Sequence, residues 1–484
     1  MLDIQKRLTN TFYALLSLPA TAMGFALSVQ ISALSWILST KYGLAIDEIG
    51  LVWAAGPIAG ILGQVVVGII SDNVWFWGGR RRPFMLIGGV LATLMLLALP
   101  SIDVISTAMG IEGILGVAIA VALTLDLAIN VSFNPTRSVI ADVTPEGVAR
   151  TKGYTWMQTV SGTFGVLAYA IGAVWGNYVL IYFGAGLVLV FSVIPPFFID
   201  EPRELGDMES EDDTPGFSAM ETLQAIRPLW GFLIYAVYGM TARVLEVESE
   251  GYWVELICLI ITVALILQAL LKSEDGKSED EAGMIGFKKV LAAHSFTWIG
   301  VQAMFIYMFA FIQYRIPGLS DDEMGRVVSI SFLILNAVGA LVPVLLLEPI
   351  TERIGRVRTH LISMFIMAGA YAGIALFGSS AFTIYLFMAL AGIGWGATVS
   401  LPFAIMSVKV NQSRMGLYMG LFNLSVVLPQ LVASLGVGAA VAAATNKNLI
   451  FFICAGTLLF SGFAWLLVKD DADSAAPAAP ASSH

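Results

Sequence analysis

One carboxylic acid lies deep inside a long apolar segment of this sequence. Asp126 stands in the stretch 114–132, where its neighbours on both sides are apolar. An ionised carboxylate at the centre of a membrane helix costs roughly 2.5–3.5 kcal/mol on insertion scales, so it is rarely kept without a task. The carboxyl avoids that cost by binding a proton, and a group that gains and loses a proton there is a natural coupling site. The alternative is a protonated Asp that only hydrogen-bonds a neighbouring helix.

Asp126 also begins a polar stripe. Asn130, Asn134 and Arg137 follow at steps of 4, 4 and 3 residues, so the four side chains share one helical face. Arg137 lies about 16 Å from Asp126 along the helix at 1.5 Å per residue, which is too far for direct pairing. We therefore predict that Asp126 is the proton site and that Arg137, with Asp142, is part of a gate. For Arg137 the alternative is a side chain that only extends to the membrane interface.

Uncharged polar and aromatic side chains in other apolar segments could bind a polar, non-ionic solute. Amides make directional hydrogen bonds to hydroxyl groups, and aromatic rings offer a platform for C–H faces. The alternative for each amide is an interhelical hydrogen bond worth about 1 kcal/mol, and for each ring it is packing. The candidate amides are Gln30, Asn130, Gln302, Asn336, Asn423 and Gln430, and the candidate rings are Trp298, Trp395 and Phe422.

The composition indicates the elements that must position these residues. Hydrophobic residues make up 58% of the 484 positions and charged residues only 12%, against about 25% charged residues in soluble chains. Apolar stretches recur at about 20 residues, the length of a membrane-spanning helix. We therefore expect an all-α polytopic membrane protein. Its 14 candidate spans are 12–38, 49–70, 84–100, 111–133, 153–176, 179–197, 228–242, 253–271, 294–314, 326–347, 359–378, 382–405, 416–440 and 448–468.

The spans fall into groups of six, two and six. We expect an N-terminal six-helix bundle over 1–200, a linker with two extra membrane helices over 201–290, a C-terminal six-helix bundle over 291–468 and a disordered tail over 469–484. Within the part 201–290, the segment 272–283 is predicted to be an acidic linker before the second six-helix group. Small-residue runs at 56–60 and 391–398 are expected to let helices approach closely.

The distribution of charge predicts the orientation in the membrane. Lys and Arg gather in alternate loops, which are expected to be cytoplasmic, so both termini are placed in the cytoplasm. The setting expected for such a chain is the bacterial inner membrane, with the protein functional as a monomer. The net charge of −10 is concentrated in the acidic linkers and the tail, which argues against a nucleic-acid partner.

Few residues suggest other chemistry. Cys258 and Cys454 both stand in apolar spans, and His294, His360 and His484 are too scattered for a metal site. We expect no cofactor other than a proton as coupling ion. No nucleophile–base pair supports an enzyme.

An internal repeat connects the two six-helix groups. After the second span of each group, an acid precedes a Gly-Arg pair. The acids are Asp72 and Glu352, and the pairs are Gly79-Arg80 and Gly355-Arg356. This pattern resembles the loop between helices 2 and 3 in each half of the major facilitator superfamily. The resemblance implies the major facilitator fold and a charged network that holds a gate shut and breaks during transport. Ordinary stop-transfer charge would explain the arginines alone.

Three stretches are similar to plant sucrose transporters and to bacterial maltose and sucrose transporters of the glycoside–pentoside–hexuronide branch. They are 52–84, with its GRRRPF ending, 125–142 and 416–438. The resemblance implies proton-coupled symport of an α-glucoside disaccharide, with Asp126 matching the proton-binding Asp and Arg137 matching an Arg needed for transport. The chain departs from the plant pattern by lacking a His in 42–51 and acids in 297–313, and by its extra helix pair. An uncoupled or export-type carrier of another glycoside or small organic solute stays open.

Overall fold

The computed structural model of the chain describes residues 3–60, 70, 74–145, 148–203, 219–244, 251–410 and 415–470. In this part of the chain the regular elements are helices, and no named strand occurs. Eleven helices among the described residues are long and apolar enough to cross a membrane. The expected all-α polytopic membrane fold is therefore confirmed, whereas the expected number of fourteen spans is not.

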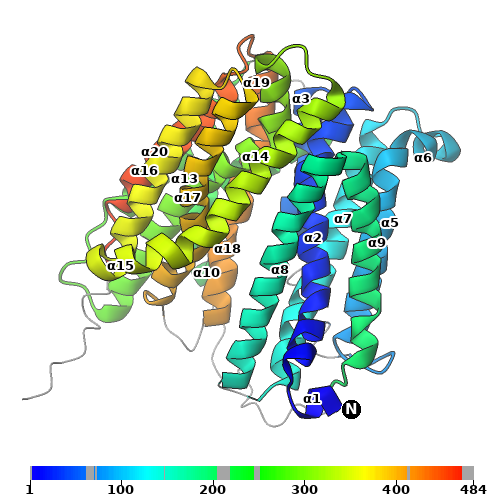
Figure 1. Cartoon of the computed structure of the whole chain (residues 1–484). Coiled ribbons are helices and arrows are strands. Elements are labelled where there is room, and N and C mark those ends of the chain that lie inside the picture. Colours follow the sequence, from blue (N-terminus) through cyan, green and yellow to red (C-terminus); the bar gives the residue numbers. More distant parts are fainter. Residues whose placement is uncertain are drawn as a thin grey trace, which may run out of the picture.

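The helices up to residue 198 form one group, coloured blue to teal in Figure 1. They are α1 (Asp3–Lys6), α2 (Asn10–Thr40), α3 (Ile46–Trp53), α5 (Arg82–Ala98), η1 (Leu99–Ser101), α6 (Ile102–Met109), α7 (Leu115–Val143), α8 (Val148–Trp175), α9 (Asn177–Val193) and η2 (Pro195–Phe198). Helix α2 packs against α7, α8 and α9, so it is central to this group.

The helices from residue 279 onward form a second group, coloured green to red in Figure 1. They are α13 (Glu279–Arg315), α14 (Asp321–Val342), η5 (Pro343–Leu347), α15 (Glu348–Ile354), α16 (Arg356–Phe377), α17 (Ala381–Ser407), α18 (Met415–Val432), η7 (Ala433–Val437), α19 (Gly438–Ala443) and α20 (Leu449–Trp465). Gly396 of the small-residue run in α17 lies so close to Gly339 of α14 that a Cβ would come within 2.8 Å of the Gly339 carbonyl oxygen. The expected close approach is present here.

Two further apolar helices separate the groups. They follow α10 (Ala219–Ala225) and η4 (Arg227–Leu229), and they are α11 (Trp230–Val244) and α12 (Trp253–Leu270). Helix α12 packs on α13 and α11 packs on α18, so the inserted pair lies against the second group. The loop after α12 is held by a buried ion pair of 2.8 Å between Glu274 and Lys289.

Helix α13 begins earlier than the sequence predicted. The segment 272–283 was expected to be an acidic linker before a span at 294, but the helix already starts within it, at Glu279. Ser278 caps it by accepting a hydrogen bond from the Glu281 backbone N–H, and three acids occupy its first turn. Acids at a helix N-terminus interact favourably with the helix dipole. The acidic run therefore forms the first turn of α13.

The two groups lie side by side, and their ribbons diverge from the α3–α19 end toward the end that carries the N-terminus (Figure 1). At the α3–α19 end they are joined by hydrogen bonds. The Ser32 and Ser329 hydroxyls lie 2.8 Å apart, and the Trp36 indole N–H donates to the Asp321 carbonyl oxygen at 2.8 Å. A Cβ at Gly50 of α3 would collide with the Tyr307 hydroxyl and the Ser434 carbonyl oxygen. This α3–α19 end is therefore closed by direct backbone approach.

The expected tail beyond residue 470, the acidic segment 207–214 and the predicted gate residue Asp72 lie outside the described residues.

Candidate functional site

Asp126 lies buried in α7, where its carboxyl faces α2 and the residues after α3. The side chain is 6% exposed, and the Gln30 amide N–H donates to its Oδ2 at 3.0 Å. Gly56 packs against the same carboxyl, because a Cβ there would stand 3.4 Å from Oδ2. Among the described residues, no Lys, Arg or His forms an ion pair with Asp126. The carboxyl is therefore buried with a neutral hydrogen-bond partner, the setting in which the neutral acid is favoured over the ion.

The predicted polar stripe continues from Asp126 toward the C-terminus of α7. Asn130 and Asn134 are half-buried and Arg137 is exposed, so exposure rises along the stripe. The Asn130 amide donates to the Asp126 backbone carbonyl at 2.8 Å, one helical turn back. The guanidinium of Arg137 lies over the Phe133 ring at 4.9 Å. The stripe thus connects a buried carboxyl with an exposed cation along one face of α7.

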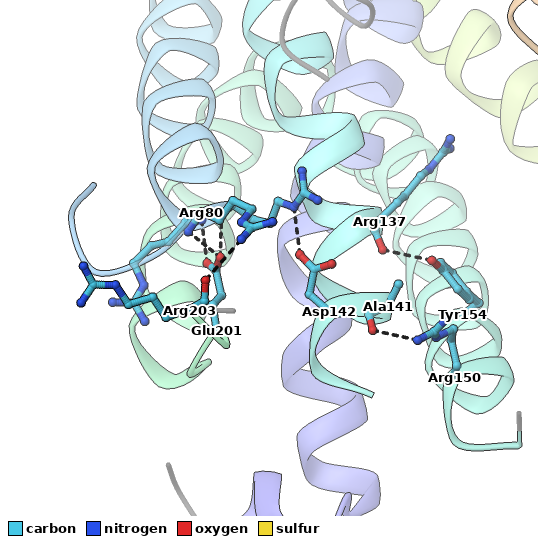
Figure 2. A network of polar contacts seen from close by, with 10 residues as sticks. Arg80, Arg137, Ala141, Asp142, Arg150, Tyr154, Glu201 and Arg203 are labelled. Carbon is cyan, nitrogen blue, oxygen red and sulfur yellow. Dashed lines mark hydrogen bonds and ion pairs between the residues drawn. The ribbon is translucent and has the colours of Figure 1, made fainter. Parts of the chain in front are cut away.

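Asp142, a predicted gate residue, forms an ion pair with Arg81 in this conformation. The Arg81 Nε donates to Asp142 Oδ2 at 2.9 Å, and each side chain is 7% exposed. Figure 2 shows the side chain of Arg137 pointing away from Asp142. The Arg137 backbone carbonyl oxygen accepts a hydrogen bond from the Tyr154 hydroxyl at 3.3 Å. The side chain of Arg81 belongs to the turn before α5, so this pair ties α5 to the end of α7. Arg137 and Asp142 do not pair in this conformation.

An acid at the end of the first group caps α5. The Glu201 carboxylate accepts hydrogen bonds from the backbone N–H groups of Arg80, Arg81 and Arg82 at 2.7, 2.7 and 2.8 Å (Figure 2). Gly79 allows the approach, since a Cβ there would stand 2.6 Å from Glu201 Oε1. A carboxylate at a helix N-terminus satisfies free N–H groups and interacts favourably with the helix dipole.

The second group repeats this cap. Asp470, after α20, accepts a hydrogen bond from the Val357 N–H at 2.9 Å at the start of α16. Gly355 precedes it with a φ of 87°, and a Cβ there would collide with the Asp470 carboxylate. In each group, the backbone at the Gly-Arg pair therefore contacts the carboxylate of an acid that follows the last helix of that group.

The remaining predicted gate residues have fewer contacts. The Arg80 side chain donates to the Arg203 carbonyl oxygen at 3.3 Å. Glu352 is exposed in α15 and Arg356 is half-buried at the start of α16. Within the described ranges, neither of these two side chains forms an ion pair.

The candidate sugar-binding residues of the second group form a neutral cluster. The Gln430 amide N–H donates to Gln302 Oε1 at 3.1 Å, which joins α18 to α13. The Trp395 indole N–H donates to Asn336 Oδ1 at 3.2 Å, which joins α17 to α14. The rings of Trp298 and Trp395 lie 6.2 Å apart in a T-shaped arrangement. Five predicted residues are thus placed in linked pairs on four helices.

The other candidates make different contacts. Gln30 bonds Asp126 in the first group and Asn130 bonds its own helix. Asn423 is half-buried on α18, with no side-chain hydrogen bond among the described residues. The Phe422 ring stacks on His294 at 4.9 Å.

The sequence interpretation missed four residues of these networks: Arg81, Glu201, His294 and Asp470. Two of them could have been found from the internal repeat. Glu201 and Asp470 each follow the last span of a six-helix group, so they occupy equivalent positions in the two halves. His294 stands four residues before Trp298, which places both on one helical face. For Arg81 nothing in the sequence distinguishes it from its neighbours Arg80 and Arg82.

A family model described as Major Facilitator Superfamily matches residues 16–434. The chain belongs to the Major Facilitator Superfamily. The match covers most of both helix groups and confirms the fold that the paired Gly-Arg loops predicted.

Curated relatives of this superfamily member include sugar carriers. The sucrose transport protein SUC4 of Arabidopsis thaliana is 24% identical over 455 residues, which cover 87% of this chain and 82% of the relative. The general alpha-glucoside permease of Schizosaccharomyces pombe is 29% identical over 174 residues, 32% of this chain and 31% of that protein. These relatives are the kind of transporter that the three sequence stretches resembled.

Solved structures show the same fold. The nucleoside transporter NupG has a TM-score of 0.62 at 12% identity, covering 95% of this chain and 99% of the other. The POT family transporter PepTSo has a TM-score of 0.65 at 12% identity, covering 96% of this chain and 98% of the other. The relatives and these neighbours are transporters and not enzymes, in agreement with the prediction for this superfamily member.

Proposed function

We propose that this protein is a proton-coupled symporter that carries an α-glucoside disaccharide, sucrose or maltose, across a membrane by alternating access. The observation that supports the proposal most is Asp126, which is buried, has a neutral amide as partner and stands at one end of a polar stripe. A carboxyl in that setting can hold a proton inside the membrane and lose it when water reaches it.

Gln30 links the proton site to the solute. Its amide N–H is committed to Asp126, while its Oε1 is buried without a hydrogen-bond partner among the described residues. An unsatisfied buried acceptor costs about 1–3 kcal/mol, so this oxygen favours any donor that enters. A sugar hydroxyl that donates to Gln30 would sense the same amide that holds Asp126. That shared residue couples binding of the sugar to the state of the carboxyl.

The neutral cluster of the second group supports a sugar as solute. Gln302, Gln430 and Asn336 offer amide groups, and Trp298 and Trp395 offer apolar ring surface, the combination that suits hydroxyl groups and C–H faces. The relatives named for sucrose and alpha-glucoside transport agree with this chemistry.

The orientation follows from the loop charges. With both termini in the cytoplasm of a bacterial cell, the α3–α19 end faces outside and is closed in this conformation. The proton would leave Asp126 toward the cytoplasm along Asn130, Asn134 and Arg137. The Arg81–Asp142 pair, with Arg80, Arg137, Asp72, Glu352 and Arg356, would belong to the cytoplasmic gate. The proton would be the coupling ion, without a further cofactor, and the monomer would be the working unit.

The proposal is tested with purified protein in liposomes that hold an inward proton gradient. Radiolabelled sucrose and maltose are supplied separately, and uptake is compared with that after a protonophore collapses the gradient. For one proton per sugar, a gradient of one pH unit supports accumulation of about tenfold. Accumulation that disappears with the gradient is the expected result. Gradient-independent uptake would indicate an uncoupled carrier, and export of sugar or absence of flux for both sugars would also contradict the proposal.

A further inference from the structure

Both indole N–H groups of the neutral cluster are already used. Trp298 Nε1 donates to His294 Nε2 at 2.8 Å, and Trp395 Nε1 donates to Asn336 Oδ1 at 3.2 Å. Each donor has a fixed acceptor on the protein, so neither indole is left to bind a hydroxyl oxygen. What the two rings present to a solute is apolar surface.

The uncovered part of the ring cluster is confined to these two residues. Trp298 and Trp395 are half-buried, whereas Phe305, Phe332 and Tyr169 are 6%, 0% and 3% exposed. The five rings form a continuous line of edge contacts from Tyr169 of the first group through Phe332 and Phe305 to the two indoles. The line starts where the two groups meet, and most residues of α13 between 285 and 312 are buried. Trp298 and Trp395 therefore carry the exposed ring surface of this line.

His294 fixes the orientation of one indole. Its Nε2 accepts the Trp298 hydrogen bond, so the proton of the neutral ring is on Nδ1. The ring is 1% exposed, stacks on Phe422 with an interplanar angle of 13°, and has no partner for Nδ1 among the described residues. A buried polar atom without a partner costs about 1–3 kcal/mol, so His294 is a costly residue for packing alone.

Asn336 has the matching role for the other indole. Its Oδ1 accepts from Trp395, and its Nδ2 donates to the Phe332 carbonyl at 2.9 Å, so the amide orientation is fixed from both sides. The two indoles lie 6.2 Å apart at 80°. They thus form two walls at nearly a right angle, each held by its own acceptor.

We propose that Trp298 and Trp395 form a two-walled subsite for one pyranose ring of the solute, and that His294 and Asn336 are its positioning residues. This inference rests on the proposed function. The C–H face of the sugar would lie on one indole and its edge against the other. Gln302 stands one helical turn from Trp298 and bonds Gln430. These amides would receive the hydroxyl groups on the open side.

The test uses sugar exchange at equal pH on both sides of the liposome, which does not depend on a proton gradient. His294→Leu removes the acceptor, and we expect the KM to rise about tenfold, the equivalent of 1.4 kcal/mol, with the maximal rate nearly kept. His294→Gln restores an acceptor for Trp298 Nε1, and its KM is expected within about twofold of the wild type. His360→Leu is the matched control, because His360 is also fully buried in the second group but packs on Trp465.

A binding measurement keeps the proposal falsifiable if a His294 variant folds poorly. The sucrose- or maltose-dependent change in tryptophan fluorescence is measured on the purified protein, which has 11 tryptophans. Trp298→Phe is expected to remove a large part of the change. Trp253→Phe, at an exposed position of α12, is expected to keep all of it.

The outcomes separate the two proposals. A wild-type protein that exchanges sugar, with a KM that follows the acceptor at 294, supports the subsite. Unchanged KM in His294→Leu, or an unchanged fluorescence response in Trp298→Phe, overturns the subsite while the proposed transport function stands. A wild-type protein that neither binds nor exchanges an α-glucoside overturns both.

Discussion

The two helix groups repeat one turn but fill it with different residues. Gly79, Arg80 and Arg81 in the first group correspond to Gly355, Arg356 and Val357 in the second, and an acid from the group's end caps each following helix. At the third position the first group has an arginine in a buried ion pair, whereas Val357 is 3% exposed and apolar. Both groups thus share the capped Gly-Arg turn, but only the first group has a buried charge at the third position of this turn.

The same difference extends to the interior. The first group buries the carboxyl of Asp126, while the neutral cluster of the second group consists of amides, indoles and an imidazole. A carboxyl without an ion-pair partner is costly to bury in its charged form, whereas a satisfied amide is not, so Asp126 and the neutral cluster suit different tasks. Under the proposed function, the first group would handle the proton and the second group would mainly recognise the sugar.

The largest effect on stability is expected when Arg81 of the first group is replaced by the valine that stands at the corresponding position of the second group. Arg81→Val leaves Asp142 buried without its partner, and we expect a loss of about 3–5 kcal/mol in the free energy of unfolding. The double variant Arg81→Val/Asp142→Leu should recover most of this loss, because both charges are then gone. Stability is measured by thermal and denaturant unfolding in detergent.

The control for this prediction is Lys41→Ala. It removes the partly exposed pair of Lys41 and Asp103 and should cost about 0–1 kcal/mol. Equal losses in the single and double Arg81 variants would show that the ion pair is not the cause.

The two caps should differ less strongly. Glu201 accepts three backbone N–H groups and Asp470 accepts the Val357 N–H, so Glu201→Ala is expected to cost about 2 kcal/mol and Asp470→Ala about 1 kcal/mol. The same unfolding assay ranks them. A larger loss for Asp470→Ala would contradict the account of the caps.

A smaller effect is expected in the second group. Trp395→Phe keeps a ring but removes the donor to Asn336, and we expect the KM for sugar exchange to rise about threefold, as for an interhelical hydrogen bond of about 0.6 kcal/mol. Gradient-driven coupling should persist in this variant. Loss of coupling with an unchanged KM would indicate that the second group takes part in proton handling, which contradicts the account.

The sequence was sufficient for features that depend on local pattern. Apolar length predicted the membrane helices, and the burial cost of a lone carboxylate singled out Asp126. The helix expected to start at residue 294 starts at Glu279, because Ser278 caps it within the acidic linker. Partners distant in sequence could not be predicted, since Gln30 lies 96 residues from Asp126. The choice of Arg81 over Arg137 for Asp142 depends on how α5 packs on α7, which no spacing reveals.

The most direct test of this division is sugar-induced proton movement by wild type and Asp126→Asn in lightly buffered liposomes. On addition of sucrose or maltose, the account predicts alkalinisation of the outer medium by the wild type and none by Asp126→Asn. The variant should still exchange sugar with a KM close to that of the wild type. Full alkalinisation by Asp126→Asn would contradict the assignment of the proton to this carboxyl.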